Sequence, residues 1–190
     1  MKDVRIGIGM CGSFCTYGKI FSCMEQLLEE EFSLTTVFSF QSQKIDSRFG
    51  KAKDFIDKAE KLTGKAAITT IEDAEPVGPK KMFDLFMIAP CTGNTLAKLA
   101  LGITDSPVLM AAKSHLRINR PVLIFVSTND ALSANFKNIG QLMNTKNIYF
   151  VPFSQDNYML KPHSLVSDSS KVLPAIESAL KREQIEPVIL

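Results

Sequence analysis

The sequence predicts a three-layer α/β fold, in which a mainly parallel six-stranded sheet of the Rossmann-like type is covered by helices on both faces. Apolar runs of strand length alternate along the chain with segments whose apolar residues recur at helical spacing. Strands and helices that alternate in this way form a parallel sheet joined by right-handed crossovers. A chain of 190 residues is long enough to bury a substantial core, and we expect one domain over residues 1–190.

Six runs have the length and the aliphatic, aromatic or β-branched residues that are typical of strands. They are Val4–Ile8, Leu34–Phe40, Ala67–Ile71, Phe83–Ala89, Pro121–Ser127 and Asn147–Val151. We expect Pro90 to end the fourth run, because proline cannot continue a central strand.

Helices are expected between these runs. They cover Ile20–Glu31, Ala52–Leu62, Leu96–Ala100, the segment after Ser106, Ser133–Met143 and Ser169–Arg182. Asn94 or Thr95 can cap the third helix, and Gly64 and Gly102 stand where helices end. The segments Gln41–Arg48, Glu72–Lys81 and Phe153–Asp168 are polar or rich in proline and are expected to be loops.

Composition excludes several classes of function. The net charge is +2 and the basic residues are dispersed among acidic ones, so nucleic-acid binding is not indicated. No apolar run approaches the ~20 residues of a membrane span, and no signal-peptide segment follows Met1. The four cysteines form no Cys-x-x-Cys pair, which favours a reducing cytoplasm and gives no support to a metal site.

The loops Gly9–Thr16 and Pro90–Thr95 are the richest in glycine, hydroxyl and cysteine side chains. In a sheet of this kind a ligand binds beyond the carboxyl ends of the strands, where the strand order reverses. The first loop contains a Gly-x-Gly-x-x-Gly pattern, but the second strand ends in Ser39 rather than in the acid that a dinucleotide site requires. A phosphate at Gly12, Ser13 and Ser39 is therefore favoured. The alternative is that the glycines serve only helix–strand packing.

The segment Ile88–Val108, IAPCTGNTLAKLALGITDSPV, resembles the signature of the homo-oligomeric flavin-containing cysteine decarboxylase superfamily. This resemblance implies the strand order 3-2-1-4-5-6 and a bound FMN, with its phosphate at Gly12, Ser13 and Ser39. It also implies that the flavin ring and ribityl chain lie along a second set of residues. These are Cys91, Thr92, Gly93, Asn94 and Thr95, with Ser127 at the end of the next strand.

Two features of that superfamily are absent. The decarboxylases carry a catalytic histidine roughly where Pro76–Gly78 stand, and no histidine precedes Ser114 in this chain. Their substrate-clamping Pro-x-Met-Asn segment is replaced by Ser127–Asp130. Decarboxylation of a cysteine derivative is therefore disfavoured, although the fold and the flavin pocket are expected to persist.

Three further segments, IGMCGSFCTY, DAEPVGPKK and KPHSLVSD, are similar to one branch of the superfamily, the B subunits of bacterial dipicolinate synthase. The resemblance implies oxidation of dihydrodipicolinate to dipicolinate in the cytoplasm of the mother cell during sporulation. It implies an A subunit that carries a nicotinamide cofactor (NADP) and self-association into a trimer or a multiple of three. The rival interpretation is a non-catalytic flavin- or phosphate-binding partner of the A subunit.

Candidates for catalysis are few. His163 can exchange a proton near neutral pH, Lys161 can attract a dicarboxylate, and Asp130 is either an acid in the crevice or a helix cap. Lys80 and Lys81 are other possible dicarboxylate ligands, and His115 is expected to interact with a helix dipole.

Two further expectations concern apolar and sulfur-containing side chains. Cys11 and Cys91 are either reactive thiolates or, more simply, small buried side chains. Apolar residues around the third helix exceed what one face can bury and predict a subunit interface; they are Leu96, Leu99, Leu101 and Ile103.

Overall fold

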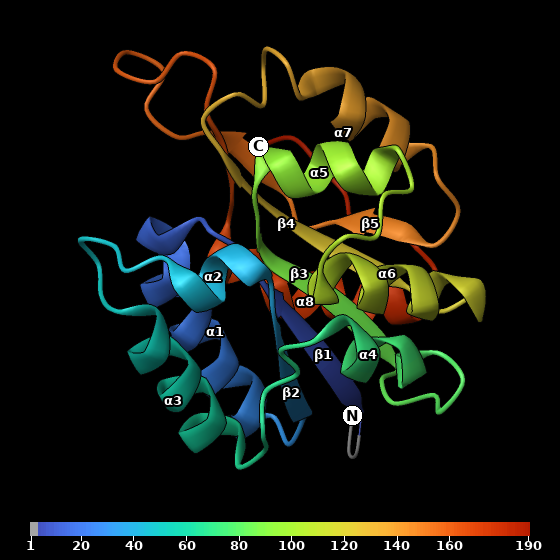
Figure 1. Ribbon diagram of the computed structural model, residues 1–190. Coiled ribbons are helices and arrows are strands. Elements are labelled where there is room, and N and C mark those ends of the chain that lie inside the picture. The colour runs from blue at the N-terminus through green and yellow to red at the C-terminus, as the bar shows by residue number, and fades with distance from the viewer. Residues whose placement is uncertain (1–3) are drawn as a thin grey trace.

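The computed structural model describes residues 4–190 and contains one seven-stranded, mostly parallel sheet (Figure 1). The strands are β1 (Arg5–Met10), β2 (Ser33–Phe38), β3 (Leu85–Cys91), β4 (Val122–Thr128), β5 (Ile148–Phe150), β6 (Phe153–Gln155) and β7 (Leu165–Ser167). They lie in the order β2-β1-β3-β4-β7-β6, and β5 also pairs with β4. The predicted fold class is confirmed, with seven strands instead of six.

Helices cover both faces of the sheet (Figure 1). They are α1 (Tyr17–Glu29), α2 (Phe40–Lys44), α3 (Ala52–Thr63), α4 (Ile71–Ala74), α5 (Gly93–Ala100), α6 (Pro107–Arg117), α7 (Phe136–Met143) and α8 (Val172–Leu180). Side chains of α1, α3 and α8 pack in one core cluster, and those of α4, α5, α6 and α7 pack in the other. Strand β3 serves both clusters, because its successive side chains point to opposite faces.

The strand order reverses between β1 and β3, which are parallel neighbours with β2 on one side and β4 on the other. This arrangement agrees with the expected order, and it brings the loops after β1 and β3 to the same edge of the sheet. Strand β3 continues through Pro90 to Cys91, so the expected end at Ala89 is wrong. The register with β4 shifts between Ile88 and Cys91, and a proline is tolerated at such an irregularity.

Gly7 and Gly9 make the close packing of β1 possible. A Cβ atom at Gly7 would collide with the rings of Phe83 and Phe86, and one at Gly9 would lie 2.9 Å from Val108 and 3.0 Å from Phe86. These two glycines are therefore required by packing rather than by a ligand, as the alternative interpretation of the glycine pattern proposed.

The run Ala67–Ile71 was expected to be a strand, but only Ile68 pairs with β2, through a single bridge to Val37. The strand cannot extend because Thr70 caps α4, accepting a hydrogen bond from the backbone N–H of Asp73 at 3.1 Å.

Three segments that were expected to be loops contain regular structure. Gln41–Arg48 overlaps α2, which Ser39 caps. Glu72–Lys81 contains α4 and a 3-10 turn at Glu75–Val77, in which Val77 is fully buried. Phe153–Asp168 forms the antiparallel pair β6 and β7. These short elements were not predicted because the segments are polar and each element has only three to five residues, too few to show a periodic apolar pattern.

His115 does not serve the dipole of α6 as expected. Its imidazole is fully buried, with its ring centroid 6.3 Å from that of Phe86. Burial, helped by the charge of Arg120, lowers the pKa of His115 to about 4 from its usual 6.5. The side chain is therefore neutral in the folded protein at pH 7.

We expect this histidine to make the fold sensitive to acid. The folded pKa lies below the unfolded one, so between pH 6.5 and 4 the unfolded chain binds a proton that the folded chain does not. The free energy of unfolding should then fall as the pH falls through this window, by up to about 3 kcal/mol, and should show no contribution from His115 above pH 6.5. Urea denaturation at several pH values measures how the free energy of unfolding depends on pH.

His115→Phe should reduce this pH dependence, whereas His163→Gln, at an exposed position, should leave it unchanged. An unchanged pH dependence in His115→Phe would contradict the assignment.

Candidate functional site

Two adjoining cavities lie at the carboxyl ends of β1, β3 and β4. The larger cavity, of about 700 Å³, lies beside α2, α5 and α6. The smaller cavity, of about 380 Å³, lies beside the start of α1, the end of β4 and the β6–β7 hairpin. Gly12 and Thr92 line both cavities and separate them. The two expected loops thus form one divided crevice.

The loop after β3 is fixed to the loop after β1. Thr92, rather than Asn94 or Thr95, caps α5, because its hydroxyl accepts a hydrogen bond from the backbone N–H of Thr95 at 3.3 Å. The hydroxyl of Thr95 in turn donates to Cys11 Sγ at 3.3 Å. Asn94 is left exposed at the larger cavity.

Ser39 is positioned at the other side of the larger cavity. It caps α2, and the hydroxyl of the neighbouring Ser42 lies 2.9 Å from both Ser39 Oγ and the carbonyl oxygen of Met10. Lys44 and Lys98 also line this cavity, and Lys98 forms an ion pair with Asp105 at 2.6 Å. The cavity therefore combines hydroxyl groups with cationic side chains.

Gly12 differs from the two packing glycines. A Cβ atom there would have no neighbour within 4 Å except the ring edge of Phe14, at 3.9 Å. The backbone of Gly12 therefore faces open space between the cavities, where a ligand can approach it closely.

Gly93 and Asp130 form a structural contact. A Cβ atom at Gly93 would collide with Asp130 and Asn135. Asp130 accepts hydrogen bonds from Thr128 Oγ1 at 2.6 Å and from Asn135 Nδ2 at 2.7 Å. Since both carboxylate oxygens are engaged and Asp130 lines neither cavity, it braces the loop after β4 against the start of α5.

The smaller cavity contains three hydroxyl groups in contact. Ser127 Oγ lies 2.8 Å from Ser13 Oγ and 2.7 Å from Thr16 Oγ1. Ser127 and Thr16 are 3% and 5% exposed, so both hydroxyls are held in a nearly dry environment. Cys15 lies at the rim, with its sulfur 3.9 Å from Ser13 Oγ and 3.8 Å from Thr16 Oγ1.

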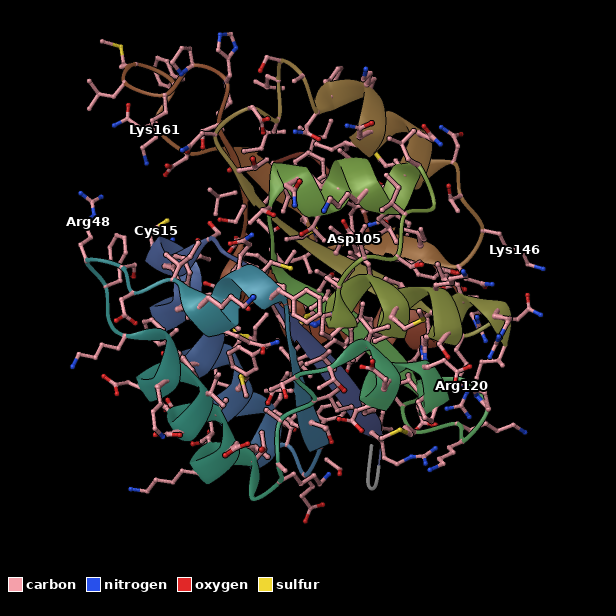
Figure 2. All side chains as sticks on the ribbon, viewed as in Figure 1. Cys15, Arg48, Asp105, Arg120, Lys146 and Lys161 are labelled. Carbon is pink, nitrogen blue, oxygen red and sulfur yellow. The ribbon has the colours of Figure 1, made fainter. Side chains whose placement is uncertain are left out.

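Two lysines border the smaller cavity. Lys19 comes from α1, and Lys161 comes from the β6–β7 hairpin. Lys161 forms an ion pair with Asp156 at 2.7 Å, and this carboxylate raises the pKa of the lysine. Figure 2 shows Lys161 and Cys15 on facing sides of the same opening.

The other proposed substrate ligands lie elsewhere. His163 is exposed and lines neither cavity. Lys80 and Lys81 precede β3 and so lie toward the amino ends of the strands, away from the crevice. Of the three lysines proposed to hold a dicarboxylate, only Lys161 borders either of these cavities.

The buried cysteines fit the simpler interpretation. Burial raises the pKa of Cys11 to about 11 and raises that of Cys91 well above its usual value. Both are therefore thiols at neutral pH and act as small core side chains. Cys91 and Gly93 line neither cavity, whereas the other proposed flavin ligands line one or both.

Sequence reasoning did not name Thr16, Cys15 or Lys19 as site residues. Thr16 and Cys15 lie on the expected crevice loop, but only the tertiary structure shows that they meet Ser127 and Ser13 there. Within residues 4–190, no group of three or more His, Cys, Asp or Glu side chains is suited to hold a metal ion. No helix in that range is long and apolar enough to span a membrane.

The chain belongs to the Flavoprotein family, whose pattern matches residues 1–176. It is 46% identical over 190 residues to the B subunit of dipicolinate synthase of Bacillus subtilis (strain 168), covering 100% of this chain and 95% of the relative. It superimposes on the crystal structure of the B subunit of dipicolinate synthase from Bacillus halodurans C with a TM-score of 0.90 and 43% identity, over 100% and 98% of the two chains. The FMN-dependent cysteine decarboxylase SpaF shares the fold, with a TM-score of 0.69 and 24% identity over 94% and 95% of the chains.

We expect Cys15 to be the single reactive cysteine of the folded protein. It is exposed, whereas Cys11, Cys23 and Cys91 are buried. Iodoacetamide should therefore label one site per chain under native conditions and all four in urea, as counted by intact mass. Cys15→Ser should abolish native labelling. Rapid native labelling of a second cysteine would contradict the burial of Cys11, Cys23 and Cys91.

Proposed function

We propose that this chain is the B subunit of a dipicolinate synthase, which oxidises dihydrodipicolinate to dipicolinate together with an A subunit during sporulation in the cytoplasm. The observation that carries the proposal is the 46% identity to the B subunit of dipicolinate synthase, which extends over the whole chain. The resemblance of the crevice sequence to flavin-binding decarboxylases supports a role for a flavin.

Of the residues that the resemblance assigns to FMN, five line the larger cavity and fit the cofactor: Gly12, Ser39, Thr92, Asn94 and Thr95. Ser13 and Ser127 line only the smaller cavity, so they are not assigned to the flavin in this proposal. The open backbone at Gly12 offers a place for close approach, and Ser39 and Lys44 are suited to a phosphate. Thr92, Asn94 and Thr95 offer hydroxyl and amide groups to the rest of the cofactor. A bound flavin would supply a hydride acceptor, and the alternative acceptor is a nicotinamide, NADP by resemblance, on the A subunit.

Oxidation of a dihydropyridine to a pyridine removes one hydride and one proton. Among the described residues no imidazole lines either cavity, and the two carboxylates that do, Asp105 and Asp156, are both paired with lysines. This observation favours a chain that holds a flavin and the substrate while the A subunit or water accepts the proton. It also argues against an FMN-dependent cysteine decarboxylase, which would need a histidine at the crevice.

A reconstituted assay tests the proposed function. This chain alone, the isolated A subunit and the mixture of the two are supplied with dihydrodipicolinate and NADP, and dipicolinate is measured by its ultraviolet absorbance. Dipicolinate should form fastest in the mixture. If the isolated A subunit matches the mixture, this chain is not a functional component of the synthase.

We expect Gly12→Ala to weaken flavin binding without unfolding the protein. The added methyl group meets no protein atom closer than 3.9 Å, but it enters the space between the cavities. Fluorescence titration with FMN should show an affinity loss of about tenfold or more, at an unchanged melting temperature.

Gly18→Ala is the matched control, since Gly18 is exposed in α1 and has no neighbour within 4 Å of an added Cβ. It should keep the flavin affinity and add stability of about 0.5–1 kcal/mol. Equal FMN affinity in Gly12→Ala and the parent would place the flavin elsewhere.

We expect the chain to form a trimer or a multiple of three. The structure buries Leu96 and partly buries Leu99, but Leu101 is 70% exposed and Ile103 is 40% exposed. Exposed apolar side chains of this kind suit a subunit interface. Leu101→Asp should lower the mass in sedimentation equilibrium, whereas Leu160→Asp, at an exposed position on the β6–β7 hairpin, should not. A monomeric parent protein would refute this expectation.

A further inference from the structure

We infer that the smaller cavity is a carboxylate-binding site, distinct from the flavin cavity, and that it holds the dicarboxylate substrate on this chain. The hydroxyl cluster of Ser13, Thr16 and Ser127 forms its floor, and Lys161 and Lys19 form its cationic rim. The identity of the substrate rests on the proposed function, but the argument for a carboxylate site does not.

The hydroxyl cluster can donate a hydrogen bond to a ligand. Three hydroxyl groups carry three protons, and the two contacts among them, Ser13 to Ser127 and Ser127 to Thr16, use two. The third proton can be donated either to Cys15 Sγ, a weak acceptor 3.9 Å from Ser13 Oγ and 3.8 Å from Thr16 Oγ1, or to a ligand in the cavity, and a carboxylate oxygen is the stronger acceptor of the two. Because Ser127 and Thr16 are almost fully buried, an anionic acceptor there would gain a stronger hydrogen bond than it has in water.

The charges at the rim favour an anion. The side chains that line the cavity include two lysines and one aspartate, so their sum is positive. The ammonium group of Lys161 has three donors, and its ion pair with Asp156 uses one of them. The remaining donors are available to a carboxylate.

The position of the cavity suits a substrate that reacts beside a flavin. Gly12 and Thr92 line both cavities, so ligands that fill them lie on either side of the same two residues. A volume of about 380 Å³ admits a small ring with two carboxylates. Two cavities in contact therefore allow the reacting molecules to be held next to each other.

Cys15 provides a probe of occupancy that is already present in the chain. Its sulfur lies within 4 Å of both Ser13 Oγ and Thr16 Oγ1, at the rim of the cavity. Iodoacetate carries a carboxylate, whereas iodoacetamide is neutral and otherwise similar. In both reactions the cysteine sulfur bonds to the methylene carbon, iodide leaves, and the thiol proton passes to solvent.

The experiment compares the two alkylation rates at Cys15 in the full-length protein. A carboxylate site should bind iodoacetate before it reacts, so the rate should saturate with iodoacetate concentration. The ratio of the iodoacetate rate to the iodoacetamide rate should exceed that of the same protein in urea by about tenfold or more. Millimolar dipicolinate in metal-free buffer should slow alkylation by iodoacetamide.

Two variants test the residues. Ser127→Ala should lower the rate ratio toward the value in urea, because it breaks the hydroxyl cluster. Lys161→Gln, at an exposed position, should also lower it, because it removes a positive charge from the rim. Lys146→Gln is the matched control, since Lys146 is an exposed lysine on the other side of the molecule (Figure 2) and should keep the parent ratio.

Several outcomes would overturn the inference. One is a parent rate ratio equal to that in urea, and another is no slowing by dipicolinate. A third is slowing by FMN and inorganic phosphate but not by dipicolinate or riboflavin, which would make the smaller cavity the flavin phosphate site. If dipicolinate fails to protect Cys15 while the reconstituted assay still forms dipicolinate, this inference fails and the proposed function stands. If Cys15 is protected but the mixture is inactive, the carboxylate site stands and the proposed function fails.

Discussion

The lack of a side chain at Gly7 and Gly9, two neighbouring positions on one face of β1, is the constraint on which the crevice depends. Gly7 and Gly9 leave room for the rings of Phe83 and Phe86 and for Val108 of α6. Strand β1 can therefore lie beside β3 with α6 packed closely over both. That packing brings the ends of β1 and β3 together at the point where the strand order reverses, and the two loops that follow them line the cavities.

Most polar side chains of the crevice also hold its backbone in place. Thr92, Ser39 and Ser106 each cap a helix, and Thr95 connects the loop after β3 to Cys11. A group that is used for structure has less capacity left for a ligand. The open backbone at Gly12 and the hydroxyl cluster around Ser127, whose remaining proton has only a weak sulfur contact to Cys15, are therefore the most available ligand contacts, and each faces a cavity.

The layers and the helix boundaries at Gly64, Gly102 and Ser106 could be predicted from the residues, because periodicity and capping chemistry are local. The strand order came from family resemblance alone. Neither source revealed α2 or the pairing of β6 with β7, since elements of three to five residues carry almost no periodic signal. Thr16 was missed for a different reason. Its partner Ser127 is 111 positions away, and only the tertiary structure brings the two hydroxyls together.

His115 shows a related limit of sequence reasoning. Its position near the end of α6 is favourable for a charged histidine, but the ring is buried against Phe86 and is neutral. Whether a side chain of α6 is buried depends on which face of the helix meets the sheet. Adjacent positions of a helix point about 100° apart, so a shift of one residue is enough to change the result. A local rule about helix ends cannot supply that information.

The segment Pro76–Gly78, where the resemblance to the decarboxylases places a histidine, lies far from the crevice of the same chain. Here it forms a 3-10 turn packed on α6, and the N–H of Gly78 donates to Ser114 Oγ at 2.9 Å. Ser106, at the other end of α6, lines the larger cavity. Eight residues of helix separate Ser106 from Ser114, which is roughly 12 Å. If a second copy of the chain brought this segment to the crevice, it would bring Pro76, Val77 and Gly78, none of which can transfer a proton. The described crevice therefore has no histidine in the place that the resemblance assigns to the decarboxylases. The proposed oxidation is compatible with this arrangement if the proton that leaves with the hydride passes to water or to the A subunit.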